Sequence, residues 1–371
     1  MSANWRGLQV LDRPQPTSRW TWALLRLGRI ALAFAGGTLV FVATGLPVAG
    51  TYRAMWSGAF GSTSSLAQTL VASTPLILTG LSVTVARWVR LWNLGAEGQL
   101  YMGAAFATAV AQSYPNWPRP LLVLVMLAAG SLGGAAWALG PALLKVGLRV
   151  NEIITTLILN FVAILLVDYL LHGRWRDPLA LGFPLSRQLS SNSTMPALFG
   201  TAVHAGLLIA LAAAFLLWIA ASWFPLGHFA SVTAKRREAG DAPMPGTWKI
   251  VPVMLASGAL AGIAGMGEVS GVTHRLGTDA SANYGYVGIL VAVLSRFSPL
   301  GVMVVAIPFG ALLVGGFALR NMATSAWVVA TLQGTIVAIV LASELLARFR
   351  LRGRWMWWKG ATHQACHVRS Q

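Results

Sequence analysis

The sequence has 371 residues, which is long enough for two or three soluble domains, but 56% of them are hydrophobic and only 10% are charged. With a mean hydropathy of +0.66, this composition excludes ordinary soluble domains and predicts a membrane protein. The 27 Lys and Arg exceed the 10 Asp and Glu, giving a formal net charge of +17. Such an excess indicates nucleic-acid binding in a soluble chain and cytoplasmic loops in a membrane chain, so the positions of the charges decide between them.

A helix needs about 20 mostly apolar residues to cross a bilayer. We therefore expect an all-α polytopic membrane protein with about ten (eight to ten) transmembrane segments. The first interval exceeds a usual signal-peptide core, and we interpret it as a retained signal anchor and first transmembrane helix. The eighth interval is too short for an ideal span and is a candidate for a broken or re-entrant piece. The ten intervals are 30–48, 65–86, 98–115, 120–144, 153–171, 201–224, 250–270, 285–296, 299–318 and 326–346.

The basic residues predict the orientation of these segments. We divide the chain into a basic N-terminal segment, 1–29, a transmembrane domain, 30–346, which includes an inner loop, 225–249, and a basic tail, 347–371. If both termini are cytoplasmic, 20 of the 27 Lys and Arg lie inside, as expected from the positive-inside rule. Nucleic acid is then not needed as a partner. The seven outer residues are Arg53, Arg119, Arg174, Arg176, Arg187, Arg275 and Arg320.

One weak internal repeat is present. Arg90–Ala109 aligns with Arg275–Leu294 at an offset of 185, with five identities in 20 positions. The same offset places the second interval on the seventh and the third on the eighth, in opposite membrane orientations. This favours two inverted five-helix repeats with a substrate path at their interface, although coincidence between helices rich in Gly and Ala is the alternative.

Small residues also recur at four-residue spacing. Gly130 and Gly134 form one such pair, and Gly258 and Gly262 form another. This spacing predicts helices whose backbones approach closely within the membrane.

The segment Asn93–Gly103 is the most informative polar string, because Asn93, Glu97 and Gln99 stand at the start of an apolar interval. A carboxylate at a helix centre costs about 2.5–3.5 kcal/mol on insertion scales, so it needs a partner, a cavity or an interfacial position. The two amides can hydrogen-bond a polar solute. The alternative is a helix cap with Glu97 in the first turn, where the helix dipole favours it.

Four stretches in order carry a family resemblance. Asn93–Gly103 resembles the signature of the nucleoside and simple-sugar permeases of ATP-binding-cassette (ABC) importers, which are related to the branched-chain amino acid permeases. Similar family stretches are Asn151–Asn160, Ser257–Gly262, and Tyr284–Ile289 running on to Pro299–Gly301. Together they cover about residues 60 to 320.

The resemblance implies a permease like those of type II importers, in the inner membrane of a bacterium. Two permease subunits, identical or different, would surround one path, with ABC ATPase subunits inside and an extracytoplasmic substrate-binding protein outside. Membrane lipid is a further expected partner. The residues that we expect to line or shape the path are Asn93, Glu97, Gln99, Asn160 and Glu268.

The chain is not expected to hydrolyse ATP itself. A P-loop needs Gly-Lys followed by Ser or Thr, and none of its four Lys residues is followed by either. We therefore predict a transporter subunit that is not an enzyme and binds no cofactor, with ATP on a partner. The His residues show no metal-ligand spacing, so no metal site is predicted. In the resembled family the inner loop docks on the ATPase through a Glu-Ala-Ala-like element, and Glu238, Ala239 and Gly240 stand there, although Gly240 and the nearby Pro243 and Pro245 are poor helix formers.

The predicted function is import of a nucleoside or simple sugar by alternating access. An ion-coupled secondary transporter with inverted repeats is the alternative. A channel or membrane-embedded enzyme is a further one, but no cluster of catalytic His, Cys or Asp supports the enzyme. If Gln99 serves the path, Gln99→Ala lowers uptake without lowering membrane abundance.

Overall fold

The computed structural model describes residues 4–5, 8–12, 19–198, 200–223 and 247–320, and beyond these 331, 334–335, 338–339, 342 and 349–353. The chain divides into two compact units, one formed by Met1–Val48 with Ala326–Gln371 and the other by Ala49–Ser325. The described part is mostly helical, as expected.

The first unit contains α1 (Arg19–Ala43) and a small antiparallel sheet of β1 (Asn4–Trp5), β2 (Leu8–Asp12) and β3 (Phe349–Gly353), in that order. The sequence analysis did not predict this sheet. Leu8 pairs with Gly353, and pairing between such distant segments leaves no local signal in the composition. The helix also begins at Arg19, within the segment 1–29 that we predicted to precede it.

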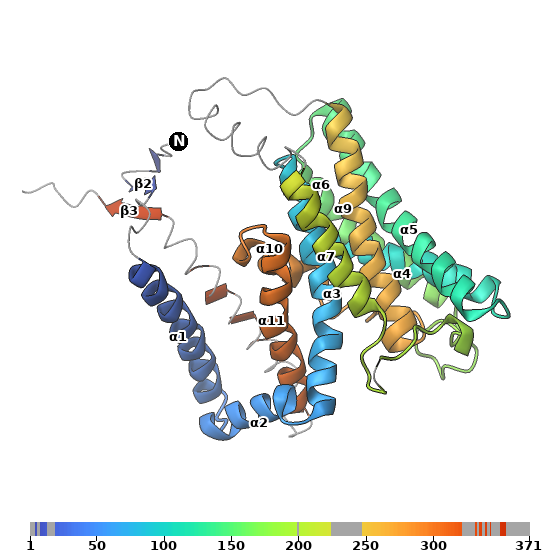
Figure 1. Ribbon diagram of the computed structural model, residues 1–371, viewed down its shortest axis with the longest axis horizontal. Coiled ribbons are helices and arrows are strands. Elements are labelled where there is room, and N and C mark those ends of the chain that lie inside the picture. The colour runs from blue at the N-terminus through green and yellow to red at the C-terminus, as the bar shows by residue number, and fades with distance from the viewer. Residues whose placement is uncertain are drawn as a thin grey trace, which may run out of the picture. The chain divides into compact units, whose positions relative to one another are not determined.

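The second unit holds the remaining described helices (Figure 1). Nine of the ten predicted apolar intervals contain a described helix, and the tenth, 326–346, lies almost wholly outside the described residues. Five described segments are long and apolar enough to cross a membrane: Thr63–Trp88, Arg119–Leu148, Glu152–His172, Lys249–Thr273 and Pro299–Leu319. The elements are α2 (Val48–Phe60), α3 (Thr63–Trp88), α4 (Ala96–Ser113), α5 (Arg119–Leu148), α6 (Glu152–His172), η1 (Ser191–Ser193), α7 (Gly206–Trp223), α9 (Thr247–Glu268), η2 (Val269–Thr273), α10 (Tyr284–Leu294) and α11 (Pro299–Arg320).

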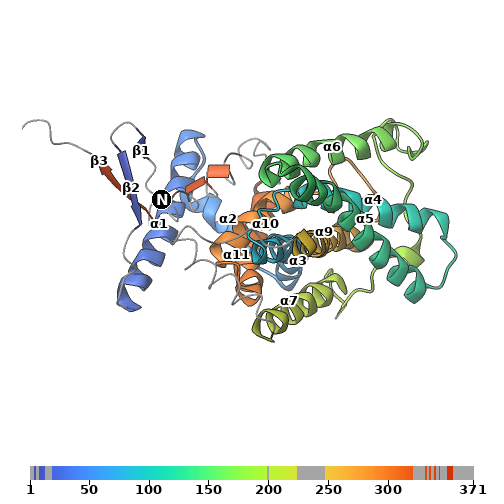
Figure 2. The ribbon, with the colours of Figure 1, turned by 90° about the horizontal axis from the view of Figure 1, so that it is seen from above.

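Helix α3 lies at the centre of this unit, in contact with α9, α10, α11 and α7. Figure 2 shows α6 and α7 on opposite sides of the central helices. Of the apolar window of α3, 89% is buried inside the protein, against 22% for α6. A helix that is surrounded by protein can carry hydroxyl groups within the membrane if they are hydrogen-bonded. Three buried examples are Thr79, Ser82 and Thr84.

The glycine pairs hold α4, α5 and α9 together. A Cβ at Gly134 would collide with the carbonyl of Gly258, and a Cβ at Gly262 would collide with that of Gly130. Gly103 of α4 lies against the backbone of Gly262 in the same way. The close approach predicted from the four-residue spacing is confirmed, because these backbones meet where only glycine fits.

Two short helical features differ from the prediction. Helix α2 was missed, since its 13 residues include Arg53 and two glycines and no long apolar run marks it. It packs on the end of α11, where Gly58 lies against Ala318. The π-helical turn η2, which continues α9, was also missed. Helix α10, by contrast, has 11 residues, which confirms that the eighth interval is short.

Candidate functional site

The polar string begins where the chain turns from α3 into α4. Arg90 has a positive φ of 62°, and α4 begins at Ala96 after an N-cap, Gly95, that has no side chain to cap it. The cap comes from Asn93, whose Oδ1 accepts a hydrogen bond from the Gly95 backbone N–H at 3.0 Å. The loop thus supplies the acceptor that the free N–H groups at a helix start require.

Asn93 and Gln99 form a reciprocal amide pair. The Asn93 Nδ2 donates to Gln99 Oε1 at 2.8 Å, and the Gln99 Nε2 donates to Asn93 Oδ1 at 3.0 Å. Asn93 Nδ2 also reaches Ser257 Oγ of α9 at 2.7 Å and Ser82 Oγ of α3 at 3.2 Å. All four side chains are buried. This cluster, which we call the amide network, joins α3, α4 and α9.

Asn160 clamps the same helix start from α6. Its Oδ1 accepts from the Gly98 backbone N–H at 2.8 Å, and its Nδ2 donates to the Leu94 carbonyl at 2.7 Å. Gly98 is required at this contact, because a Cβ there would lie 2.9 Å from Asn160 Cα. Asn160 therefore satisfies one donor and one acceptor that the turn into α4 leaves free.

Glu97 reaches across to the start of α10. Its Oε2 accepts from the Gly285 backbone N–H at 2.6 Å, and the Ser281 side chain and the Tyr286 backbone lie within hydrogen-bonding reach. Gly285 packs directly on the Glu97 backbone. The first turns of α4 and α10 therefore meet, and the carboxylate of one helix caps the free N–H groups of the other, where the dipole favours a negative charge.

This junction of α4 and α10 lies deep within the bundle. Asn160 is eight residues from the start of α6 and 12 from its end, or about 12 and 18 Å at 1.5 Å per residue. On the other side, Thr79 of α3 donates to the Tyr284 carbonyl at 3.0 Å. Thr79 lies about 24 Å from the start of α3 and about 14 Å from its end by the same measure.

Glu268, at the end of α9, is the predicted site residue that takes no part in the hydrogen bonds of this junction. Its side chain is buried and makes no hydrogen bond with any residue in the described ranges. It lies within electrostatic reach of Tyr284, as Glu97 also does. The structure thus brings Asn93, Glu97, Gln99 and Asn160 together around two helix starts, with Glu268 nearby. Whether these residues line a path stays a prediction.

The sequence analysis missed several contributors to this junction. Ser82, Thr79 and Ser281 carried no signal, because single hydroxyl residues are ordinary in apolar helices and loops. Ser257 and Tyr286 lie within the stretches that resemble the permease family. The predicted coupling residues Glu238, Ala239 and Gly240 lie outside the described residues.

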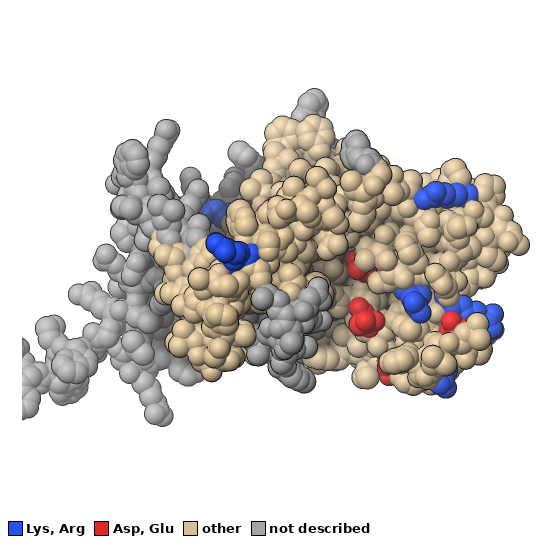
Figure 3. All heavy atoms as spheres, turned by 90° about the horizontal axis from the view of Figure 1, so that it is seen from below, with Lys and Arg blue, Asp and Glu red and all other residues tan. Residues whose placement is uncertain are grey.

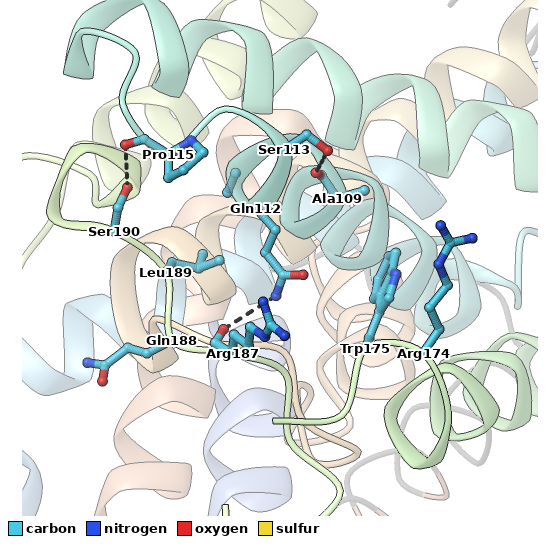
Figure 4. A pocket seen from close by; sticks show the side chains of 11 residues that line it. Ala109, Gln112, Ser113, Pro115, Arg174, Trp175, Arg187, Gln188, Leu189 and Ser190 are labelled. Atoms are coloured by element: carbon cyan, nitrogen blue, oxygen red, sulfur yellow. Dashed lines mark hydrogen bonds between the residues drawn. The ribbon is translucent and has the colours of Figure 1, made fainter. Parts of the chain in front are cut away.

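A separate cavity of about 520 Å³ lies where the end of α4 meets the loop between α6 and α7 (Figure 4). Gln112 Nε2 donates to the Arg187 carbonyl at 3.4 Å, and Ser190 Oγ donates to the Pro115 carbonyl at 3.1 Å. Arg174 and Trp175 form another side of it. On the face that bears this loop, charged side chains gather mainly over the half that lies away from α2 (Figure 3).

Two histidines lie at the same loop. His204, just before α7, is 4% exposed, and its Nδ1 accepts from the Gly206 backbone N–H at 3.1 Å. Burial, with a contribution from His274, lowers the pKa of His204 to about 4. The Nδ1 of His274 is buried without a hydrogen-bond partner in the described part of the chain. The His204 imidazole is therefore neutral near pH 7.

Comparison with known proteins gives a consistent result. Residues 65–341 match the family described as branched-chain amino acid transport system, permease component. The chain is 33% identical over 335 residues to a glucose ABC transporter permease protein of Haloferax volcanii, covering 87% of this chain and 88% of that one. It is 30% identical over 346 residues to a guanosine ABC transporter permease protein of Bacillus subtilis, covering 89% and 96%. No solved structure matches the chain significantly.

Proposed function

The chain belongs to the family of branched-chain amino acid transport permease components, and we propose that it is the membrane subunit of an ABC importer for a nucleoside or simple sugar. The observation that supports this proposal most strongly is the similarity to glucose and guanosine permeases along 87% and 89% of this chain. Members of this family are transporter subunits rather than catalytic enzymes. Recognition of the solute by hydrogen bonds, without covalent chemistry, suits the amides at the junction.

The helix bounds support the proposal of two inverted repeats, and with it alternating access as the mechanism. Adding 185 to the bounds of α3 gives 248–273, which coincides with the span Lys249–Thr273 formed by α9 and η2. The same shift carries α4 onto 281–298, which contains α10. The two helices that meet at Glu97 are then equivalent members of the two repeats. In transporters of this design, the substrate site lies between repeats near the midplane.

The remaining assembly follows from this proposal. ATP is hydrolysed by separate ABC subunits, since the chain has no P-loop lysine, and they dock on the inner loop around Glu238, Ala239 and Gly240. A second permease subunit completes the path, and an extracytoplasmic binding protein delivers the solute. The protein is a multi-pass protein of the bacterial inner membrane with both termini in the cytoplasm, and Asn93, Glu97, Gln99, Asn160 and Glu268 shape its path.

Reconstitution tests the proposal directly. The chain is purified with its ATPase, second permease and binding protein, and placed in liposomes with ATP on the ATPase side. We expect uptake of radiolabelled guanosine or glucose that requires ATP, the ATPase and the binding protein. Uphill uptake by this chain alone, driven by an ion gradient, would overturn the proposal in favour of a secondary transporter.

A further inference from the structure

Helix α10 is preceded by a polar side chain, Asn283, that the helix-end contacts do not use. Asn283 precedes the helix with φ 62° and ψ 30° and makes no side-chain cap hydrogen bond. Its side chain is exposed, and Tyr286, three residues on, is half-buried. Leu290 and Val293 continue this spacing and are also half-buried. Tyr286, Leu290 and Val293 follow one side of α10 by their spacing, and together with Asn283, which directly precedes the helix, we call them the α10 stripe.

The polar end of the α10 stripe lies deep in the bundle. Tyr284, between Asn283 and Tyr286, is held by Thr79 of α3 at 3.0 Å, and the Asn160 side chain lies within hydrogen-bonding reach of the Tyr286 hydroxyl. Thr79 and Asn160 both lie well inside their spans, about 12 Å or more from either end. An exposed amide at this depth would be unfavourable against lipid. The polar end of the α10 stripe is therefore turned away from lipid.

The charge around this end favours an uncharged solute over an anion. Leu91–Pro118 and Leu276–Ser295, which form the junction of α4 and α10, contain no Lys or Arg but include Glu97 and Asp279. Glu97 and Glu268 lie within electrostatic reach of Tyr284. Phosphate recognition relies on Arg, Lys or free backbone N–H groups, and here the Gly285 N–H is already occupied by Glu97.

We propose that Asn283 and Tyr286 contact the transported solute and discriminate between solutes, and that this part of the path does not suit a phosphorylated or otherwise anionic solute. The inference rests on the proposed transport function and goes beyond the residues expected from the sequence. The Asn283 amide offers both a donor and an acceptor to a base edge or a hydroxyl. The Tyr286 ring offers a face on which a base or a sugar ring can stack.

Single-cysteine labelling tests whether the polar end of the α10 stripe is accessible to water. Cys366 is the one cysteine of the chain, so Cys366→Ser provides the background for Asn283→Cys and Tyr286→Cys. Leu165→Cys, at a site 66% exposed on the apolar side of α6, is the matched control. In membrane vesicles with the complete importer, a water-soluble quaternary-ammonium methanethiosulfonate should modify both sites at least tenfold faster than Leu165→Cys. Rates no faster than that control would overturn the proposal.

Substrate selectivity tests whether Asn283 and Tyr286 contact the solute. With guanosine and a second solute delivered by the same binding protein, Tyr286→Leu and Asn283→Ala should change the ratio of the two uptake rates at least threefold at equal membrane abundance. Tyr286→Phe keeps the ring and should move the ratio less. An equal loss for both solutes would show a packing role and would overturn the contact. If uptake still requires the ATPase and the binding protein, the importer function stands even where this inference fails.

Discussion

Gln99→Ala breaks the reciprocal pair at the centre of the amide network. The two hydrogen bonds lost are those to Asn93, at 2.8 and 3.0 Å, and both residues are buried. Asn93 keeps its contacts to Ser257 and to the Gly95 N–H. Interhelical hydrogen bonds in membranes are worth roughly 0.6 kcal/mol on average and up to about 1.7. We therefore expect Gln99→Ala to lower the free energy of unfolding by about 1–3 kcal/mol.

Asn93→Ala should cost more, because it leaves three groups without partners: both ends of the Gln99 amide and the Gly95 N–H. At roughly 0.6–1.7 kcal/mol for each group, Asn93→Ala should lower the free energy of unfolding by roughly 2–5 kcal/mol. The double variant should then be little worse than Asn93→Ala alone, with a coupling of about 1–2 kcal/mol. Unfolding of the purified protein in mixed detergent measures all three. Additive losses would refute the reciprocal pair, and Gln112→Ala, near the end of the same helix, is the matched control.

Gln99→Ala also distinguishes a structural role of Gln99 from a role in the transport path. If Gln99 only supports the fold, abundance falls and uptake per molecule remains at the wild-type level. If it also serves the path, uptake per molecule falls as well. Quantitative blotting of membranes together with initial uptake rates distinguishes the two, and wild-type uptake per molecule would exclude a path role for Gln99.

Three other perturbations have defined outcomes. Gly262→Leu pushes a side chain into the backbone of α5 and should lower the free energy of unfolding in mixed detergent by about 1–3 kcal/mol, whereas Gly267→Ala, which meets nothing within 4 Å, should be nearly neutral in the same measurement. Glu97→Ala removes the cap of α10 and should cost about 0.5–2 kcal/mol; Glu97→Gln keeps an acceptor and should recover most of it, and equal losses in detergent unfolding would contradict a capping role. Because the pKa of His204 is lowered to about 4, its contribution to stability is complete above about pH 6.5 and should be lost as the pH falls toward 4. Hydrogen exchange of the loop before α7 should show this, and His204→Gln should remove the dependence.

The sequence predicted the apolar helices well because a span leaves a long local signal. The intervals 65–86 and 153–171 differ from α3 and α6 by one or two residues at each end. The partners in the amide network left no such signal, since Asn93 and Ser257 are 164 residues apart. The sequence pattern around a serine in an apolar run is the same whether that serine faces lipid or a neighbouring helix. The small sheet escaped for the related reason that β2 pairs with the distant β3.

The structure also changes how buried polar residues in this protein are interpreted. Where two helices begin inside a membrane, each leaves free backbone N–H groups that water cannot satisfy. Asn160 accepts from one of those of α4, and Glu97 accepts from one of those of α10. The most prominent polar residues of the sequence therefore already hydrogen-bond the backbone. Contact with a solute needs groups whose hydrogen bonds are still available. By that criterion the exposed Asn283 is a better candidate for solute contact than the buried Asn93, although Asn93 is the residue that the family resemblance brought forward.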